Sequence, residues 1–202
     1  MRILAFTDLH ARKGAIDDVM KKVKDADIIV GGGDFSDWGK DTEKILERFK
    51  DCGKPVIVVH GNHESEALMH DIEKKHKHVL FLHKRSYQID KYVFFGYGGG
   101  GFSKEDGGFD KVVDKFARTI QKEDIVIIVT HGPPYGTKLD KLSNVGYAGS
   151  KSYRKFLDLK KPVLWICGHI HENFGNMDVI DNTVVVNPGP DGRIIEIYGP
   201  ES

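Results

Sequence analysis

The chain has 202 residues, enough for one ordinary domain or at most two small ones. A chain of this length buries roughly 70% of its unfolded surface, so its core needs no support from disulfides. Apolar residues make up 40% and charged residues 30%, which is typical of an ordered globular protein. Basic and acidic residues both number 30, and this balance argues against duplex nucleic acid or an anionic membrane as a partner.

The apolar runs are short throughout the sequence. The first, residues 3–6, is too short for a signal peptide or a membrane-spanning helix, and the later runs have the length of strands. The two cysteines, Cys52 and Cys167, lie far apart and match no metal-binding or redox spacing. These features predict a reduced, cytoplasmic protein without a membrane segment, and they indicate no particular oligomeric state.

Short β-branched runs alternate with amphipathic stretches along the chain. The main predicted strands are residues 3–6, 27–31, 55–60, 92–96, 125–130 and 162–167. The predicted helices are residues 14–24, 42–50, 65–76, 110–121 and 150–159. Because several strand runs are apolar at every position, both faces of the sheet are expected to be covered. The alternation indicates an α/β fold with largely parallel pairing.

Further short segments complete the predicted organisation. Residues 79–81, 86–89, 177–180, 184–186 and 194–198 are predicted to be short antiparallel strands. Residues 98–108 and 132–149 are predicted to be long loops, which in compact domains tend to be functional. Since no repeat, linker or low-complexity tract interrupts the pattern, we expect a single domain over residues 1–202.

Polar side chains follow five of the predicted strands. The residues at these strand ends are Asp8, His10, Asp34, Asn62, His63, His131, His169 and His171. In open α/β sheets the carboxyl ends of the strands lie side by side and form the ligand crevice. Asp8 and His10 are two positions apart, as are His169 and His171, so in an extended segment each pair points the same way.

Each of these residues alone has a simpler explanation as a turn residue, a helix cap or a hydrogen-bonded histidine. Their joint occurrence favours a metal site, because five of the ten histidines in the chain lie at these strand ends. The remaining histidines are predicted to be structural or surface residues. Seven residues of ligand type exceed the needs of one catalytic metal, which takes about three protein ligands and a water.

Two metals sharing a bridging carboxylate fit this number of ligands. Carboxylate, amide and imidazole groups without thiolate suit Mn, Fe or Zn. Two such metals about 3.5–4 Å apart can hold a hydroxide between them and stabilise both oxygens of an in-line displacement at phosphorus.

At these residues the sequence resembles the calcineurin-like metallophosphoesterase superfamily. The family's five blocks occur in order as Asp8-Leu9-His10, Gly33-Asp34-Phe35-Ser36-Asp37, Gly61-Asn62-His63-Glu64, Thr130-His131 and Gly168-His169-Ile170-His171. The segments His131-Gly132-Pro133-Pro134-Tyr135-Gly136-Thr137 and Asn187-Pro188-Gly189 are similar to small prokaryotic members without a cap domain. The resemblance implies a four-layer α-β-β-α sandwich of two mixed β-sheets flanked by helices.

The resemblance also implies a metal-dependent phosphohydrolase that acts on small phosphodiesters or phosphomonoesters, such as nucleotides, through a hydroxide bridging two divalent metals. The ligands that it implies are Asp8, His10 and His171 for one metal, Asn62, His131 and His169 for the other, and Asp34 as the bridge. His63 would be a catalytic residue outside the ligand set that protonates the leaving group or stabilises the phosphoryl oxygens. The alternatives are a nuclease of the same superfamily and a scaffold that retains the fold without catalysis.

Two local features bear on the substrate. Trp38 follows Asp37 at the position where protein-phosphatase members carry Arg, which argues against phosphoprotein substrates. Residues 96–101 fit the pattern G-x-G-x-x-G, but no helix is predicted to open there, so we expect a loop at the rim of the site and no dinucleotide site. The segment 133–152 is expected to form either one wall of the substrate pocket or a solvated surface loop.

Overall fold

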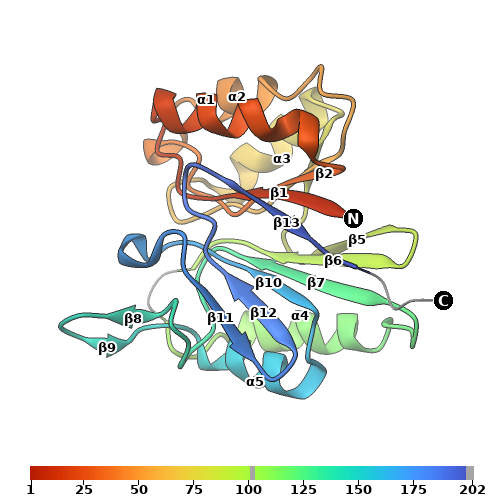
Figure 1. Ribbon diagram of the computed structural model, residues 1–202, viewed down its shortest axis with the longest axis vertical. Coiled ribbons are helices and arrows are strands. Elements are labelled where there is room, and N and C mark those ends of the chain that lie inside the picture. Colours follow the sequence, from red (N-terminus) through yellow and green to blue (C-terminus); the bar gives the residue numbers. More distant parts are fainter. Residues whose placement is uncertain (101–102, 199–202) are drawn as a thin grey trace.

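Two β-sheets lie face to face, and helices cover both outer faces (Figure 1). This architecture is seen in a computed structural model that describes residues 1–100 and 103–198. It confirms the predicted four-layer α-β-β-α sandwich of two mixed sheets. Within the described ranges, no helix has the length and apolar character needed to cross a membrane.

The first sheet contains the amino-terminal strands. Its order is β13 (Arg193–Glu196), β1 (Arg2–Phe6), β2 (Ile28–Gly31), β3 (Val56–Val58) and β4 (Val79–Phe81). The helices α1 (Lys13–Lys22), α2 (Thr42–Glu47) and α3 (Glu66–Lys75) cover its outer face (Figure 1). The prediction that residues 79–81 pair antiparallel is wrong, because α3 carries the chain back over the sheet and β4 pairs parallel with β3.

The second sheet has six strands. Its order is β11 (Met177–Ile180), β12 (Thr183–Val186), β10 (Leu164–Ile166), β7 (Ile125–Thr130), β6 (Tyr92–Tyr97) and β5 (Arg85–Ile89). Its outer face is covered by α4 (Gly107–Ala117) and α5 (Lys151–Lys160) (Figure 1). The outer strands β5 and β11 are antiparallel, as predicted, whereas β12 is antiparallel to β11 but parallel to β10.

Two segments differ from the predicted loops. Helix α4 begins at residue 107 instead of 110, because the Asp106 side chain accepts hydrogen bonds from the Gly108 and Phe109 N–H groups and caps the first turn. The segment 132–149 contains a short hairpin of β8 (Lys141–Leu142) and β9 (Gly146–Tyr147), which projects at the lower left of Figure 1. The last residue of the G-x-G-x-x-G segment, at position 101, lies outside the described residues.

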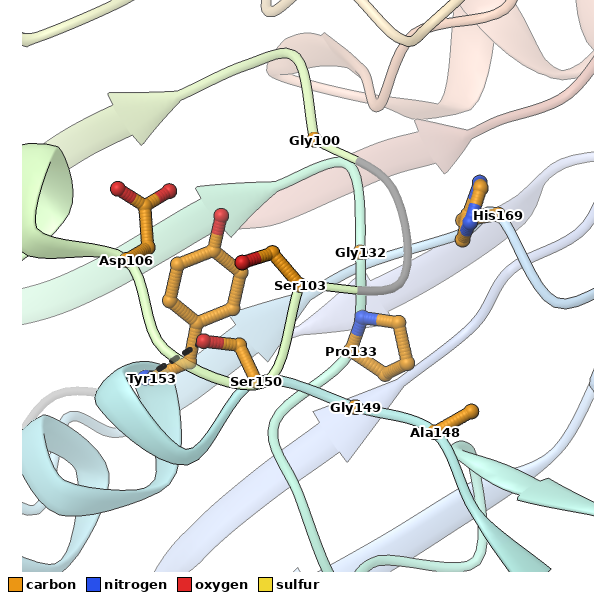
Figure 2. Close-up of a pocket in the computed structure, with 10 residues that line it drawn as sticks. All are labelled: Gly100, Ser103, Asp106, Gly132, Pro133, Ala148, Gly149, Ser150, Tyr153 and His169. Carbon is orange, nitrogen blue, oxygen red and sulfur yellow. Dashed lines mark hydrogen bonds between the residues drawn. The ribbon is translucent and has the colours of Figure 1, made fainter. Parts of the chain in front are cut away.

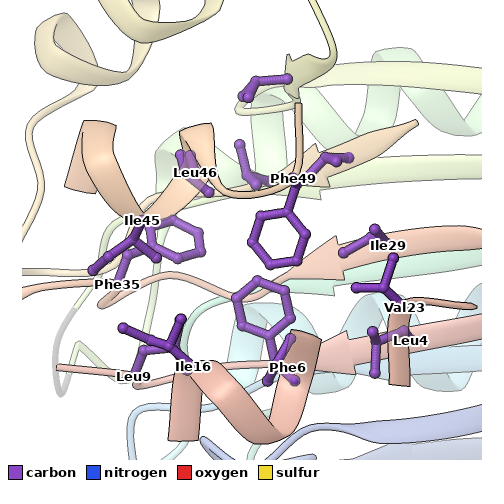
Figure 3. Close-up of a cluster of buried hydrophobic side chains, with 14 of the residues drawn as sticks. Leu4, Phe6, Leu9, Ile16, Val23, Ile29, Phe35, Ile45, Leu46 and Phe49 are labelled. Atoms are coloured by element: carbon purple, nitrogen blue, oxygen red, sulfur yellow. The ribbon is translucent and has the colours of Figure 1, made fainter. Parts of the chain in front are cut away.

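Apolar side chains fill three layers. Along β1, Leu4 and Phe6 face the helices, whereas Ile3 and Ala5 face the second sheet, and all four are fully buried. Figure 3 shows Phe6 in the helix-side layer, where its ring stacks on Phe49 with the ring centroids 5.7 Å apart. Burial on both faces explains why the strands are apolar at every position.

Two buried histidines lie where the sheets meet. His60 follows β3 and His83 follows β4, and their ring centroids are 4.6 Å apart. The Gly98 N–H, just after β6, donates a hydrogen bond of 2.9 Å to His83 Nδ1. Burial lowers the pKa of both His60 and His83 to about 4, so both imidazoles are neutral at physiological pH.

Replacing His83 with Asn should weaken the acid sensitivity of the fold. Because the pKa of His83 falls from 6.5 to about 4 on folding, its contribution to stability is complete above about pH 6.5 and is lost as the pH falls toward 4. A shift of this size corresponds to about 2 kcal/mol at pH 5. His83→Asn keeps an acceptor for the Gly98 N–H but removes the titrating group.

Urea unfolding at pH 7 and pH 5 measures this effect. The drop in the free energy of unfolding between the two values should be smaller in the variant than in the parent protein by about 2 kcal/mol. An equal drop in both proteins would show that His83 does not carry the acid sensitivity.

Candidate metal centre

The carboxyl ends of β1, β2 and β3 in one sheet and of β7 and β10 in the other meet at a single edge of the sandwich. The structure brings the predicted ligands together there. The first sheet contributes Asp8, His10, Asp34 and Asn62, and the second contributes His131, His169 and His171. Their role as metal ligands stays a prediction, but their convergence is a feature of the fold.

Asp8, His10 and His171 form one group, in which one possible ligand atom of each residue lies within 4.8 Å of the others. His171 Nε2 is 3.3 Å from His10 Nε2 and 3.4 Å from Asp8 Oδ1. Burial raises the pKa of Asp8, but the hydrogen bond to His171 and the charge of His131 outweigh burial and lower it. The same hydrogen bond raises the pKa of His171.

Asp34, His131 and His169 form a second group with ligand atoms within 4.8 Å of one another. Asn62 joins it, because His131 Nε2 lies 3.2 Å from Asn62 Oδ1. Burial lowers the pKa of His169 to about 4, so this imidazole is neutral and suited to bind a metal. Burial also lowers the pKa of His131, but its hydrogen bond to Asp34 reverses this effect and raises the pKa to about 9.

Asp34 lies between the two groups. Its Oδ2 atom is 3.2 Å from His131 Nε2 and 3.9 Å from His10 Nε2, and its Oδ1 atom accepts a hydrogen bond of 2.9 Å from the His63 N–H. Burial raises the pKa of Asp34, but the hydrogen bonds and positive charge of the neighbouring histidines outweigh it and lower the pKa to about 2. The side chain is therefore ionised and positioned to serve both groups.

Hydrogen bonds to acceptors behind the site fix the orientation of two histidines. His131 Nδ1 donates a hydrogen bond of 2.9 Å to the Gly32 carbonyl oxygen, and His10 Nδ1 donates one of 2.7 Å to Asp37 Oδ1. Each Nε2 is thereby left to face the centre. The sequence analysis did not assign a role to Asp37, although its place as the second acid of the Gly33–Asp37 block was a signal.

His63 lies beside the first group. Its ring contacts that of His10 edge-on, with the centroids 4.9 Å apart. The Trp38 N–H donates a hydrogen bond of 3.3 Å to His63 Nδ1, so the proton of the neutral imidazole is on Nε2. His63 also forms a possible ligand group with His10 and Asp37, so its predicted role outside the ligand set stays a prediction.

The backbone is strained at the centre. Asp8, His10, Asp34 and His169 adopt φ values of 54°, 45°, 52° and 69°, in the left-handed region that residues with a side chain rarely occupy. Each such residue costs about 1–3 kcal/mol, and strain of this kind clusters at functional sites. Hydrogen bonds hold the turns, since the Asp8 N–H donates to the Gly33 carbonyl and the His10 N–H to the Asp34 carbonyl.

A sequence model of the calcineurin-like phosphoesterases matches residues 1–173, which is most of the chain. The chain belongs to this family. The resemblance of its five blocks is thus confirmed, and the protein is a metal-dependent phosphohydrolase. No curated protein sequence matches the chain significantly.

Solved structures share the fold of this phosphoesterase. TT1561 of Thermus thermophilus superposes with a TM-score of 0.74 and 17% identity, over 93% of this chain and 88% of that one. A dimetal phosphatase from Danio rerio superposes with a TM-score of 0.61 and 11% identity, over 92% of this chain and 86% of that one. An archaeal phosphodiesterase superposes with a TM-score of 0.55 and 17% identity, over 94% of this chain and 84% of that one. At these identities the likeness concerns the fold.

A small pocket adjoins the His169 side of the phosphoesterase site. It is lined by Gly100, Ser103, Asp106, residues 132–133 and 148–150, Tyr153 and His169. Figure 2 shows Ser103 and Tyr153 in this pocket, with His169 at its far side. Part of each predicted loop therefore lies next to the site.

Two side chains of the segment 133–152 make contacts outside this pocket. The ring of Tyr135 packs on that of Tyr147, with the centroids 5.7 Å apart. Lys138 Nζ lies 3.6 Å from Asp178 Oδ1. The expectation that this segment forms a substrate wall stays a prediction.

Glu64 holds the turns that carry Asp34 and Asn62. Its side chain is buried and accepts hydrogen bonds from the N–H groups of Asp34, Ser36 and Gly61, at 3.0, 3.2 and 3.1 Å. Burial raises the pKa of Glu64, whereas these donors act in the opposite direction. The sequence analysis placed Glu64 in a motif but missed this role, because the donors come from two separate strand ends.

Replacing Glu64 with Gln should destabilise the protein by about 1–3 kcal/mol, because an amide NH₂ would face a buried N–H donor. The free energy of unfolding from urea titration measures this loss, and the dissociation constant for Mn²⁺ should rise in parallel. Glu66→Gln is the matched control, since Glu66 is half-exposed and pairs with Lys84 at 3.3 Å, an interaction worth at most about 1 kcal/mol. Equal losses in the two variants would contradict the role of Glu64.

Proposed function

We propose that this phosphoesterase hydrolyses small phosphodiesters or phosphomonoesters, such as nucleotides, at a dinuclear centre of Mn, Fe or Zn. The proposed ligands are Asp8, His10 and His171 for one ion, Asn62, His131 and His169 for the other, and Asp34 for both. The observation that carries the proposal is the position of the Asp34 carboxylate, 3.2 Å from a ligand atom of one group and 3.9 Å from a ligand atom of the other.

The chemistry of the donors supports such a centre. Imidazole and carboxylate groups without a thiolate suit Mn, Fe or Zn and are unlike a structural zinc site. Low pKa values keep Asp8 and Asp34 ionised, and Asn62 adds an oxygen without adding charge. Both cysteines are free thiols, which supports the expected cytoplasmic setting.

Two divalent cations would supply an acidified water as nucleophile and stabilise charge on the phosphoryl oxygens. The protein's own side chains contribute orientation and a proton. Asp37 and the Gly32 carbonyl orient His10 and His131, and the Trp38 N–H fixes the His63 tautomer with its proton on Nε2. The Nε2–H group of His63 can then donate a hydrogen bond to the departing oxygen, and full proton transfer to that oxygen requires the imidazolium form.

Removal of metal should abolish the activity. Treatment with EDTA and dialysis should eliminate the hydrolysis of bis(p-nitrophenyl) phosphate, and added Mn²⁺ should restore it, because water is a poor nucleophile at neutral pH without a metal. Loss of a residue that hydrogen-bonds to a metal ligand lowers metal affinity by about 10–100-fold. Because Asp34 is a proposed ligand of both ions, Asp34→Asn should lower the affinity for both by at least this factor.

The matched variant is Asn62→Ala, which removes a neutral ligand of one ion and should retain more metal than Asp34→Asn. Elemental analysis of loaded and desalted protein measures the difference. Full activity in metal-free protein would refute the proposal, and equal metal contents in the two variants would refute the bridging role of Asp34.

The loss of activity in His63→Ala should depend on the leaving group of the substrate. General acid catalysis contributes about 10²–10⁴-fold, so hydrolysis of alkyl esters should fall by a factor in this range. The loss should be clearly smaller for p-nitrophenyl esters, since p-nitrophenolate departs readily without a proton. Values of kcat for the two ester types, together with the metal content, test this role. Equal losses would favour stabilisation of the phosphoryl oxygens alone, and a loss of metal would make His63 a ligand.

A further inference from the structure

Trp38 is the most exposed large apolar side chain in the described part of the chain. Its side chain is 82% exposed, whereas the second tryptophan, Trp165, is fully buried in the core. So exposed an indole buries little apolar surface, and the fold gains little core packing from it. Aromatic side chains are enriched at binding surfaces, where their large flat rings bury much apolar area on contact with a ligand or partner.

The backbone at Trp38 is strained. Its φ of 55° and ψ of 29° lie in the left-handed region, inside the short turn η2 (Asp37–Gly39). Such a conformation is unfavourable for a bulky residue, and glycine would adopt it without strain. Neither burial nor backbone preference therefore explains a tryptophan at this position.

The turn nonetheless holds the indole in a defined place. The Trp38 N–H donates a hydrogen bond of 3.3 Å to His63 Nδ1, and a Cβ atom on Gly39 would lie 2.7 Å from Leu68 Cδ2, so the turn packs tightly on α3. The indole ring contacts His63, with the ring centroids 4.8 Å apart. Since its backbone is fixed, an exposed face of the ring is preorganised to bind a planar group.

Successive ring contacts connect His10, a proposed ligand, through His63 to the exposed indole of Trp38. The centroids of His10 and His63 are 4.9 Å apart, and those of His63 and Trp38 are 4.8 Å apart. If phosphorus lies at the ligands and His63 protonates the departing oxygen, the group attached to that oxygen extends toward the indole. A flat aromatic group would stack there, and bases stack on aromatic side chains without regard to sequence.

We propose that Trp38 is a specificity residue that stacks on the nucleobase of the leaving group, so that the preferred substrates are phosphodiesters with a nucleoside leaving group. This inference rests on the proposed function of the site. It adds a substrate class to the phosphoesterase activity, and it assigns the recognition of the base to a residue outside the ligand set.

A matched pair of substrates tests the proposal. One is a dinucleoside monophosphate, and the other is the same diester with an abasic sugar on the leaving side. The Mn²⁺-loaded wild type should prefer the first by about 10- to 100-fold in kcat/KM, mainly through KM, which is the range expected for one stacked base. Trp38→Ala should bring this ratio close to one, and Trp38→Phe should retain most of it. Tyr198→Ala, which removes another exposed ring beyond β13, should keep the wild-type ratio.

Tryptophan fluorescence supplies a measurement that needs no turnover. Because Trp165 is buried, quenching by a bound ligand reports mainly on Trp38. AMP should quench the emission of the wild type, ribose 5-phosphate should not, and Trp38→Phe should abolish the response to AMP.

The possible failures are distinguishable. If the proposed function is wrong, the metal-loaded wild type hydrolyses neither of the two diesters, nor bis(p-nitrophenyl) phosphate, nor p-nitrophenyl phosphate, and the inference that rests on it falls as well. If it hydrolyses a p-nitrophenyl ester but neither of the two diesters, the proposed function stands and the inference is overturned. If only the role of Trp38 is wrong, the wild type hydrolyses both diesters with equal kcat/KM, or Trp38→Ala lowers kcat/KM equally for both. An equal response to AMP and ribose 5-phosphate in the fluorescence measurement would also overturn it.

Discussion

The site depends on the face-to-face packing of the two sheets, because neither sheet alone carries the complete set of proposed ligands. Hydrogen bonds join the sheets at the edge where the proposed ligands meet: His131 Nδ1 donates to the Gly32 carbonyl, and the His169 N–H donates to Asp8 Oδ2 at 3.0 Å. A close approach at Gly168 makes this possible, since any Cβ atom there would overlap Thr7 Oγ1. The apolar layer between the sheets thus sets the positions of the polar groups beyond it.

Charge balance follows from this packing. Two buried carboxylates, Asp8 and Asp34, lie within reach of the imidazoles of His171 and His131 from the opposite sheet. In each pair the pKa of the carboxyl is lowered and that of the imidazole is raised, so that both groups are favoured in their charged forms. Burial alone would favour the neutral acid, and an unpaired buried carboxylate would be strongly destabilising. The imidazoles of the second sheet therefore allow the first sheet to hold two ionised carboxylates in its interior.

The sequence predicted the features that depend on a regular pattern. Apolar strands and amphipathic helices predicted an α/β fold with largely parallel strands, and polar residues at strand ends predicted the residues that converge. The arrangement as a sandwich of two sheets was implied only by the resemblance to the calcineurin-like family. Features set by long-range geometry were not predictable. The direction of β4 depends on the path of α3, and the hairpin β8–β9 has strands of two residues, too short for any alternation. The hydrogen bonds of Asp37 and Glu64 depend on left-handed turns at Asp34 and Trp38. Asp tolerates this conformation, but Trp has no local preference for it.

The turn η2 both orients His10, a proposed ligand, and presents an exposed side chain beside the site. Its first residue, Asp37, orients His10, and its second, Trp38, fixes the tautomer of His63 through its backbone N–H while the indole points into solvent. The backbone of Trp38 and its side chain thus serve different purposes. A substitution at this position can change what the indole contacts and leave the N–H in place. The proposed ligands lie at strand ends fixed by the core, so the side chain presented on this turn can vary without disturbing them.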